Sequence, residues 1–139
     1  MKQQNTIRIL FVCMGNICRS PAAQAVFEHK LAERELSERF QVDSSGTIAY
    51  HVGESADARM RDELSRHGIV SRSRSQQFLE SDFERYDLIL AMDRSNYTSL
   101  KRMLGQSGAR PELAARLRMF RDFDPEGQGD VPDPYYGGS

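Results

Sequence analysis

A short apolar segment leads directly into a cysteine-containing loop near the start of the chain. Residues 7–12 are mostly β-branched or apolar and predict a buried strand. Residues 13–19, Cys-Met-Gly-Asn-Ile-Cys-Arg, predict a loop. Ser20 and Pro21 then suit the N-cap and the first position of a helix. This order of strand, loop and helix places the loop at a helix N-terminus.

The later segments favour an α/β domain. Helical periodicity extends from Pro21 to Leu36, and further helices are predicted at 57–67, 80–85 and 95–104. Gly68 and Gly105 would end the helices that precede them. Further strands are predicted at 40–44, 87–92 and 117–120. Strands that alternate with helices imply a parallel sheet. We therefore expect residues 1–139 to form a single three-layer domain with a four-stranded parallel sheet. A phosphate-binding loop would join the first strand to the first helix, at the carboxyl edge of the sheet.

The loop at 13–19 combines a nucleophile with groups that bind an anion. Unpaired N–H groups and the dipole at a helix N-terminus favour a dianion such as phosphate. The same field favours the thiolate form of Cys13, and Arg19 adds a full positive charge. A thiolate directed at a bound phosphate group is the nucleophile that a phosphatase needs.

The pattern resembles that of the low-molecular-weight protein-tyrosine phosphatases. The resemblance rests on Cys-x5-Arg-Ser after the first strand and on Asp-Pro-Tyr-Tyr at 133–136, and it extends over almost the whole chain. It implies hydrolysis of phosphotyrosine through a cysteinyl-phosphate intermediate. Cys13 would be the nucleophile, Arg19 and the loop N–H groups would hold the phosphate, and Asp133 would be the general acid and then the base.

The same resemblance implies a set of substrate-binding residues. They are Met14, Gly15, Asn16, Ile17, Cys18 and Ser20 in the loop, together with Tyr50, Tyr135 and Tyr136 as aromatic walls. Asn16 would hold the shape of the loop. The Ser20 hydroxyl would donate a hydrogen bond to the sulfur of Cys13.

Two further residues would support the loop or regulate it. Ser44 resembles the residue that forms a hydrogen bond with the loop asparagine in this family, and Ser45 is an adjacent candidate for that role. Cys18 resembles a second loop cysteine that can form a reversible disulfide with Cys13.

Members of the family normally continue into a C-terminal helix, whereas the sequence stops at Ser139, so the helix is either absent or cut off.

Composition excludes several other functions. The formal net charge of −1 argues against nucleic acid or an anionic membrane as the main partner. No apolar run approaches the roughly 20 residues that a membrane span requires, and we expect a cytoplasmic protein. The two cysteines lack zinc-site spacing and no histidine cluster accompanies them, so we expect neither a metal nor a cofactor.

The resemblance implies phosphotyrosine proteins or peptides and small aryl phosphates as partners, and inhibition by phosphate-like anions.

Three alternatives stay open. Arsenate reductases on this fold pass a disulfide through additional cysteines, and the chain has none beyond Cys18. Protein-arginine phosphatases typically carry Thr where Ile17 stands. A non-catalytic phosphopeptide-binding module would be expected to lose Cys13, Arg19 or Asp133, and all three are present. The sequence therefore favours an enzyme.

Overall fold

Helices and strands alternate along the chain. The computed structural model describes residues 6–15, 19–48, 53–107 and 111–120. The strands are β1 (Ile7–Cys13), β2 (Phe40–Gly46), β3 (Leu88–Ala91) and β4 (Leu117–Met119); the helices are α1 (Arg19–Glu33), α2 (Ala58–Arg66), α3 (Asp82–Arg85) and α4 (Arg94–Ser107), with short 3-10 helices η2 (Ser37–Arg39) and η3 (Pro111–Arg116). Every strand that the sequence predicts is present.

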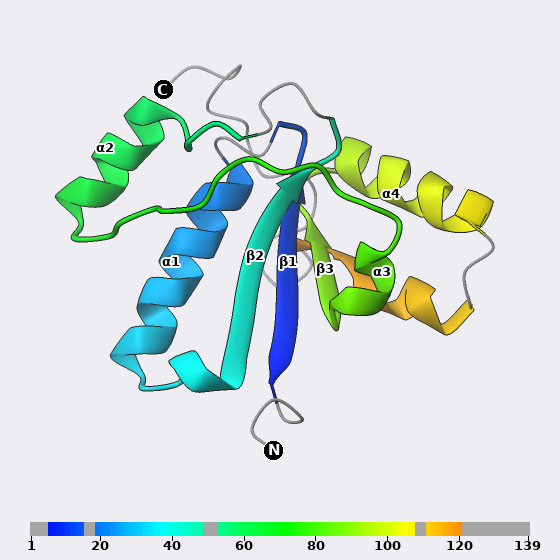
Figure 1. Ribbon diagram of the computed structural model, residues 1–139, viewed down its shortest axis with the longest axis horizontal. Coiled ribbons are helices and arrows are strands. Elements are labelled where there is room, and N and C mark those ends of the chain that lie inside the picture. Colours follow the sequence, from blue (N-terminus) through cyan, green and yellow to red (C-terminus); the bar gives the residue numbers. More distant parts are fainter. Residues whose placement is uncertain (1–5, 16–18, 49–52, 108–110, 121–139) are drawn as a thin grey trace.

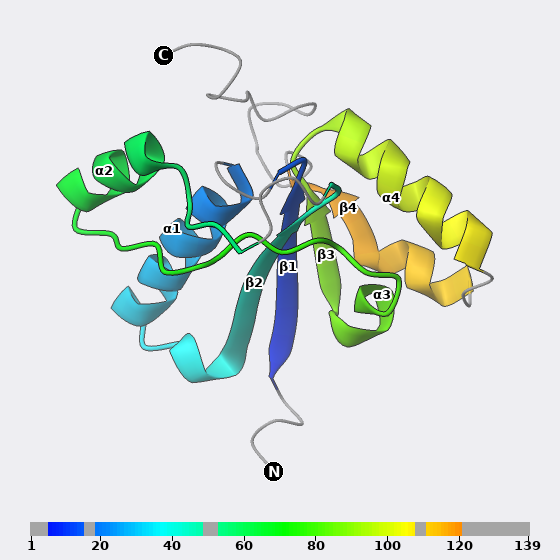
Figure 2. The same cartoon turned by 45° about the horizontal axis from the view of Figure 1, so that its top comes forward.

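The strands form one parallel sheet in the order β2-β1-β3-β4; Figure 1 shows β2, β1 and β3 in this order, and Figure 2 also shows β4. The pairing of β1 with β2 runs in register from Ile7 opposite Phe40 to Cys13 opposite Gly46. Because β1 is an inner strand, its last residue lies at the carboxyl edge near the middle of the sheet, where open α/β sheets bind ligands. The prediction of a four-stranded parallel sheet followed by a loop after β1 is confirmed.

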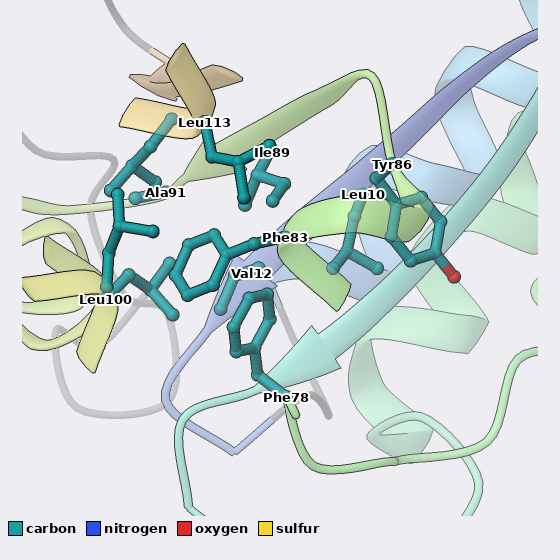
Figure 3. Packing of buried hydrophobic residues seen from close by; sticks show 11 residues of the cluster. Leu10, Val12, Phe78, Phe83, Tyr86, Ile89, Ala91, Leu100 and Leu113 are labelled. Carbon is teal, nitrogen blue, oxygen red and sulfur yellow. The ribbon is translucent and has the colours of Figure 1, made fainter. Parts of the chain in front are cut away.

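Alternate residues of β1 point into two separate cores, because successive side chains of a strand lie on opposite faces of a sheet. Leu10 and Val12 pack with buried side chains of α3 and α4, and Figure 3 shows Phe83 and Leu100 among them. Ile9 and Phe11 pack on the other face, which α1 covers. Figures 1 and 2 show α1 and α2 on one side of the sheet and α3 and α4 on the other. The predicted three layers are therefore present.

Both predicted ends of α1 differ from the structure. Helix α1 begins at Arg19, so Ser20 and Pro21 lie inside its first turn rather than at the N-cap and the first position. The hydroxyl of Ser20 lies beside the sulfur of Cys13 at the end of β1. The same helix stops at Glu33 and not at Leu36, because Glu35 adopts a positive φ of 58°.

The two glycines predicted to terminate helices behave differently. Gly68 follows α2 with a φ of 76°, a backbone conformation that favours glycine, so this prediction is confirmed. Gly105 was expected to end α4, but the helix continues through it to Ser107. A glycine inside a helix costs stability without preventing the helix, and here the prediction was wrong.

Candidate active site

The thiol of Cys13 lies at the carboxyl end of β1, beside the first turn of α1. Its side chain is buried, and the sulfur is 2.9 Å from the hydroxyl oxygen of Ser20. The Ser20 hydroxyl also lies 3.4 Å from the carbonyl oxygen of Ser45, but it has only one proton to donate. When the sulfur is a thiolate, the hydroxyl is the donor of this pair and stabilises the negative charge.

The guanidinium of Arg19 is held by the carboxylate of Asp93, a residue that is distant in the sequence. Arg19 is the first residue of α1, and its Nη1 donates to Oδ2 of Asp93 over 2.8 Å. The side chains are 6% and 18% exposed, respectively. Asp93 comes directly after the β3 segment and before α4, and its Oδ1 accepts from the backbone N–H of Asn96 over 2.7 Å. One carboxylate thus orients the arginine and caps α4.

The sequence reasoning missed Asp93. The available signal was its position, because an acidic residue directly after a buried strand lies at the same carboxyl edge as the loop after β1. Nothing in the sequence pairs it with Arg19, which is 74 residues away.

The first carbonyl groups of the loop are held by donors outside it. The carbonyl oxygens of Cys13 and Met14 accept hydrogen bonds of 2.9 and 3.0 Å from backbone N–H groups in the segment after β2. The carbonyl oxygen of Gly15 accepts a hydrogen bond of 2.8 Å from the hydroxyl of Ser75. The start of the loop is therefore fastened to two segments that are distant in sequence.

The two serines at the end of β2 have different surroundings. Ser44 is buried, and its hydroxyl donates to Oε1 of Gln24 on α1 over 2.7 Å. The Ser45 hydroxyl is buried and has no hydrogen-bond partner among the residues that the structure describes. Because Asn16 lies outside those residues, a hydrogen bond between Ser44 and Asn16 stays a prediction.

Comparison with known proteins gives the family. A family model described as "Low molecular weight phosphotyrosine protein phosphatase" matches residues 8–139. The chain belongs to this family. The low molecular weight protein-tyrosine-phosphatase of Streptomyces coelicolor is 42% identical over 136 residues, which are 96% of this chain and 80% of that relative.

Two solved phosphatase structures have the same fold. The protein tyrosine phosphatase of Entamoeba histolytica, with Hepes in its active site, superposes with a TM-score of 0.85 at 40% identity, covering 96% of this chain and 83% of that chain. The Drosophila arginine phosphatase DARP superposes with a TM-score of 0.86 at 30% identity and the same coverage.

Within this low molecular weight phosphatase, the described residues form the part of the candidate site that contains Cys13 and Arg19. The remaining predicted site residues, Asn16, Ile17, Cys18, Tyr50, Asp133, Tyr135 and Tyr136, lie outside the described residues. No group of three or more His, Cys, Asp or Glu side chains that could hold a metal occurs in the described part of the chain. Across residues 6–15, 19–48, 53–107 and 111–120, no helix is long and apolar enough to cross a membrane.

Proposed function

We propose that the chain acts as a single phosphatase domain that hydrolyses phosphotyrosine in proteins and peptides. The observation that supports this most directly is the placement of Cys13 and Arg19 at the two ends of one loop. The sulfur has a hydroxyl 2.9 Å away, and the guanidinium is oriented by a carboxylate 2.8 Å away. A nucleophile and an oriented cation that can bind phosphate are groups that a metal-independent phosphoryl transfer requires.

In the first step, the Cys13 thiolate attacks phosphorus and the bond from phosphorus to the tyrosine oxygen breaks. Asp133 donates its proton to that leaving oxygen, so that a neutral phenol departs. Negative charge is spread over the three remaining phosphoryl oxygens. The loop N–H groups of residues 14–19 bind these oxygens, and Arg19 can bind two of them at once, which a lysine could not do with the same geometry.

In the second step, the Asp133 carboxylate takes a proton from a water molecule, and the water oxygen attacks phosphorus. The bond between sulfur and phosphorus breaks, and the thiolate of Cys13 leaves. The Ser20 hydroxyl can donate to the sulfur as its charge returns, because the two atoms already lie within hydrogen-bond distance. Inorganic phosphate is released, and phosphate-like anions that occupy the same cradle are inhibitors.

The selectivity for phosphotyrosine is proposed to come from the walls of the site. Tyr50, Tyr135 and Tyr136 would deepen the opening, with Met14 and Ile17 on the loop side. A deep opening favours the long phosphotyrosine side chain over phosphoserine. Small aryl phosphates have the same aromatic leaving group and would also be substrates.

The two loop cysteines are proposed to make the enzyme sensitive to oxidants. A thiolate oxidises readily to sulfenic acid, and Cys18 could condense with it to form a disulfide and release water. Reduction by a cellular thiol would restore Cys13. A catalytic thiolate of this kind fits a reducing compartment such as the cytoplasm.

A second candidate substrate is phosphoarginine, since the Drosophila relative is named as an arginine phosphatase. Ile17 favours tyrosine, because its aliphatic side chain leaves less room for a polar guanidinium group than the threonine typical of arginine phosphatases. Comparison of a phosphotyrosine peptide with a phosphoarginine peptide of the same sequence separates the two activities.

The test is hydrolysis of p-nitrophenyl phosphate by the full chain from pH 5 to 8 in the presence of a chelator. We expect turnover that Cys13→Ser abolishes and that Asp133→Ala lowers by about 10²- to 10⁴-fold in kcat. Asp130, three residues before Asp133, is the neighbouring carboxylate, and Asp130→Ala is the matched control that should retain most of the activity. A folded wild-type chain that binds a phosphotyrosine peptide without hydrolysing it would contradict the proposal and support the phosphopeptide-binding alternative.

A further inference from the structure

We propose that Ser75 is a positioning residue for the phosphate loop. Its hydroxyl donates to the carbonyl oxygen of Gly15 over 2.8 Å, across 60 residues of sequence. This hydrogen bond holds the Gly15 carbonyl oxygen on the side that faces Ser75, which keeps the oxygen from turning toward a phosphate group bound by the loop. The inference rests on the proposed function, because it assigns Ser75 to the orientation of the group that binds the substrate's phosphate.

The C=O and the N–H of one peptide group are oriented together. In a trans peptide the C=O and the N–H point in opposite directions, and the described residues contain no cis peptide bond. A loop that binds an anion through its N–H groups must therefore turn its carbonyl oxygens outward. Any carbonyl that turned inward would place a partial negative charge against the phosphate and would remove one donor.

Three successive carbonyl groups of the loop have an external donor that could enforce this orientation. Those of Cys13 and Met14 are bound by the backbone N–H groups of Thr47 and Ile48, at 2.9 and 3.0 Å. Substitution of the side chains at 47 and 48 would leave these donors in place. The donor to the third carbonyl is a side-chain hydroxyl, so this contact alone among the three can be deleted by a substitution that leaves every backbone N–H in place.

The carbonyl group of Gly15 is also the one of the three that most needs a hydrogen-bond donor to hold it. Gly15 has no Cβ, so rotation of its peptide groups meets little steric resistance. Without an external hydrogen bond, rotation of this peptide group would cost little free energy. The two preceding residues, Cys13 and Met14, carry side chains that restrict such rotation.

Ser75 is itself firmly placed. Its side chain is buried, its backbone N–H donates to the Glu54 carbonyl, and its own carbonyl accepts from the N–H of Gly53, each over 2.8 Å. The carbonyl of the next residue, Gln76, accepts from the N–H of Gly46 at the end of β2 over 2.7 Å. Figure 1 shows this segment, between α2 and α3, passing across the carboxyl end of β2. The donor is thus fixed by the sheet and not by the loop that it orients.

The experiment compares two pairs of variants of the full chain that differ only in the hydroxyl group. Ser75→Ala is compared with the wild type, and Ser75→Val with Ser75→Thr, because valine and threonine have nearly the same shape. Ser71→Ala is the matched control in the same segment, since its hydroxyl is buried without a hydrogen-bond partner among the described residues. The readouts are the dissociation constant of inorganic phosphate by calorimetry, kcat and KM for p-nitrophenyl phosphate, and thermal unfolding.

We expect Ser75→Ala and Ser75→Val to weaken phosphate binding about tenfold, the size of effect that one lost buried hydrogen bond can produce. Ser75→Thr and Ser71→Ala should bind phosphate like the wild type. A merely structural role would lower the fraction of folded protein, which reduces the apparent kcat and the binding stoichiometry but leaves the dissociation constant unchanged. That result would overturn the inference.

Other outcomes are equally decisive. Equal phosphate affinity in both pairs would overturn the inference, and so would insolubility of the two variants without the hydroxyl, which would assign Ser75 to folding alone. A wild-type chain that binds phosphate but has no turnover would contradict the proposed function. In that case, a loss of phosphate affinity confined to the variants without the hydroxyl would still support the role of Ser75.

Discussion

The two oxygens of the Asp93 carboxylate act on two different structures. Oδ2 orients the Arg19 guanidinium, and Oδ1 caps the first turn of α4. Exposed ion pairs contribute little to stability, but both side chains of this pair are largely excluded from solvent. Removal of the carboxylate would leave a nearly buried positive charge without this partner. The residue therefore couples the anion site to the position of a helix.

Asparagine at position 93 would separate these two effects. Asp93→Asn keeps a side-chain oxygen that can cap α4 but loses the charge that orients Arg19, so we expect kcat/KM to fall about tenfold and Tm to fall because the guanidinium loses its charged partner. Asp93→Ala should lose the same activity and about 1 kcal/mol more stability than Asp93→Asn, since the cap is also removed. Steady-state kinetics and thermal unfolding measure the two effects.

Asp87→Asn is the control for Asp93→Asn. Asp87 also pairs with an arginine, Arg8, but the pair is exposed and its N–O distance is 3.6 Å. We expect this variant to keep the wild-type kcat/KM. If Asp93→Asn is as active as Asp87→Asn, then Arg19 does not depend on the carboxylate for its orientation.

At the scale of one helix, α4 contains a glycine that the helix does not require. Gly105 lies inside α4, and a Cβ atom built there would meet no atom within 4 Å. Gly105→Ala should therefore stabilise the protein by about 0.5–1 kcal/mol, because alanine loses less conformational freedom when the helix forms. Urea unfolding followed by circular dichroism measures the change.

Gly68→Ala is the opposite case and serves as the comparison. The space around Gly68 is equally open, but its φ of 76° is strained for alanine. We expect this substitution to destabilise the protein by about 1 kcal/mol. A stabilising effect at both positions would mean that the backbone conformation after α2 adapts to the side chain.

Elements of this fold could be predicted where a single segment carries its own signal. The apolar run of 7–12 indicates β1, and the glycine after α2 marks the end of that helix. The contacts of Asp93 and Ser75 could not be predicted in this way. Their partners are 74 and 60 residues away, so the sheet must bring them together before either residue acquires a role.

At the scale of the whole molecule, a buried tyrosine ties α3 to the edge strand β2. Tyr86 ends α3, and its hydroxyl donates to Oδ2 of Asp43 on β2 over 2.7 Å. Burial of the ring, followed by the hydrogen bond to Asp43, raises the pKa of Tyr86 far above its ordinary value of 10.0. The folded protein therefore keeps this proton at a pH at which the unfolded chain releases it.

The sign of the pH effect follows from this difference. Above pH 10 unfolding releases the Tyr86 proton, so stability should fall as the pH rises further, by up to about 1.4 kcal/mol per pH unit. Tyr86→Phe should remove this part of the slope and cost about 1–2 kcal/mol at neutral pH, where the hydrogen bond is intact in the wild type. Urea midpoints from pH 8 to 11 test both statements. Tyr97→Phe is the control, and it should retain the wild-type slope because Tyr86 is intact; an unchanged slope in Tyr86→Phe would refute the assignment.

The inner position of β1 has a consequence for the order in which the protein comes apart. Its residues 9–12 pair with a strand on each side, and the backbone amides of such segments exchange with heavy water only when the whole domain opens. Cys13 follows these residues directly, so the proposed nucleophile is attached to one of the most slowly opening parts of the molecule. Fraying of the outer strands and helices in warm solution should therefore precede any displacement of the sulfur.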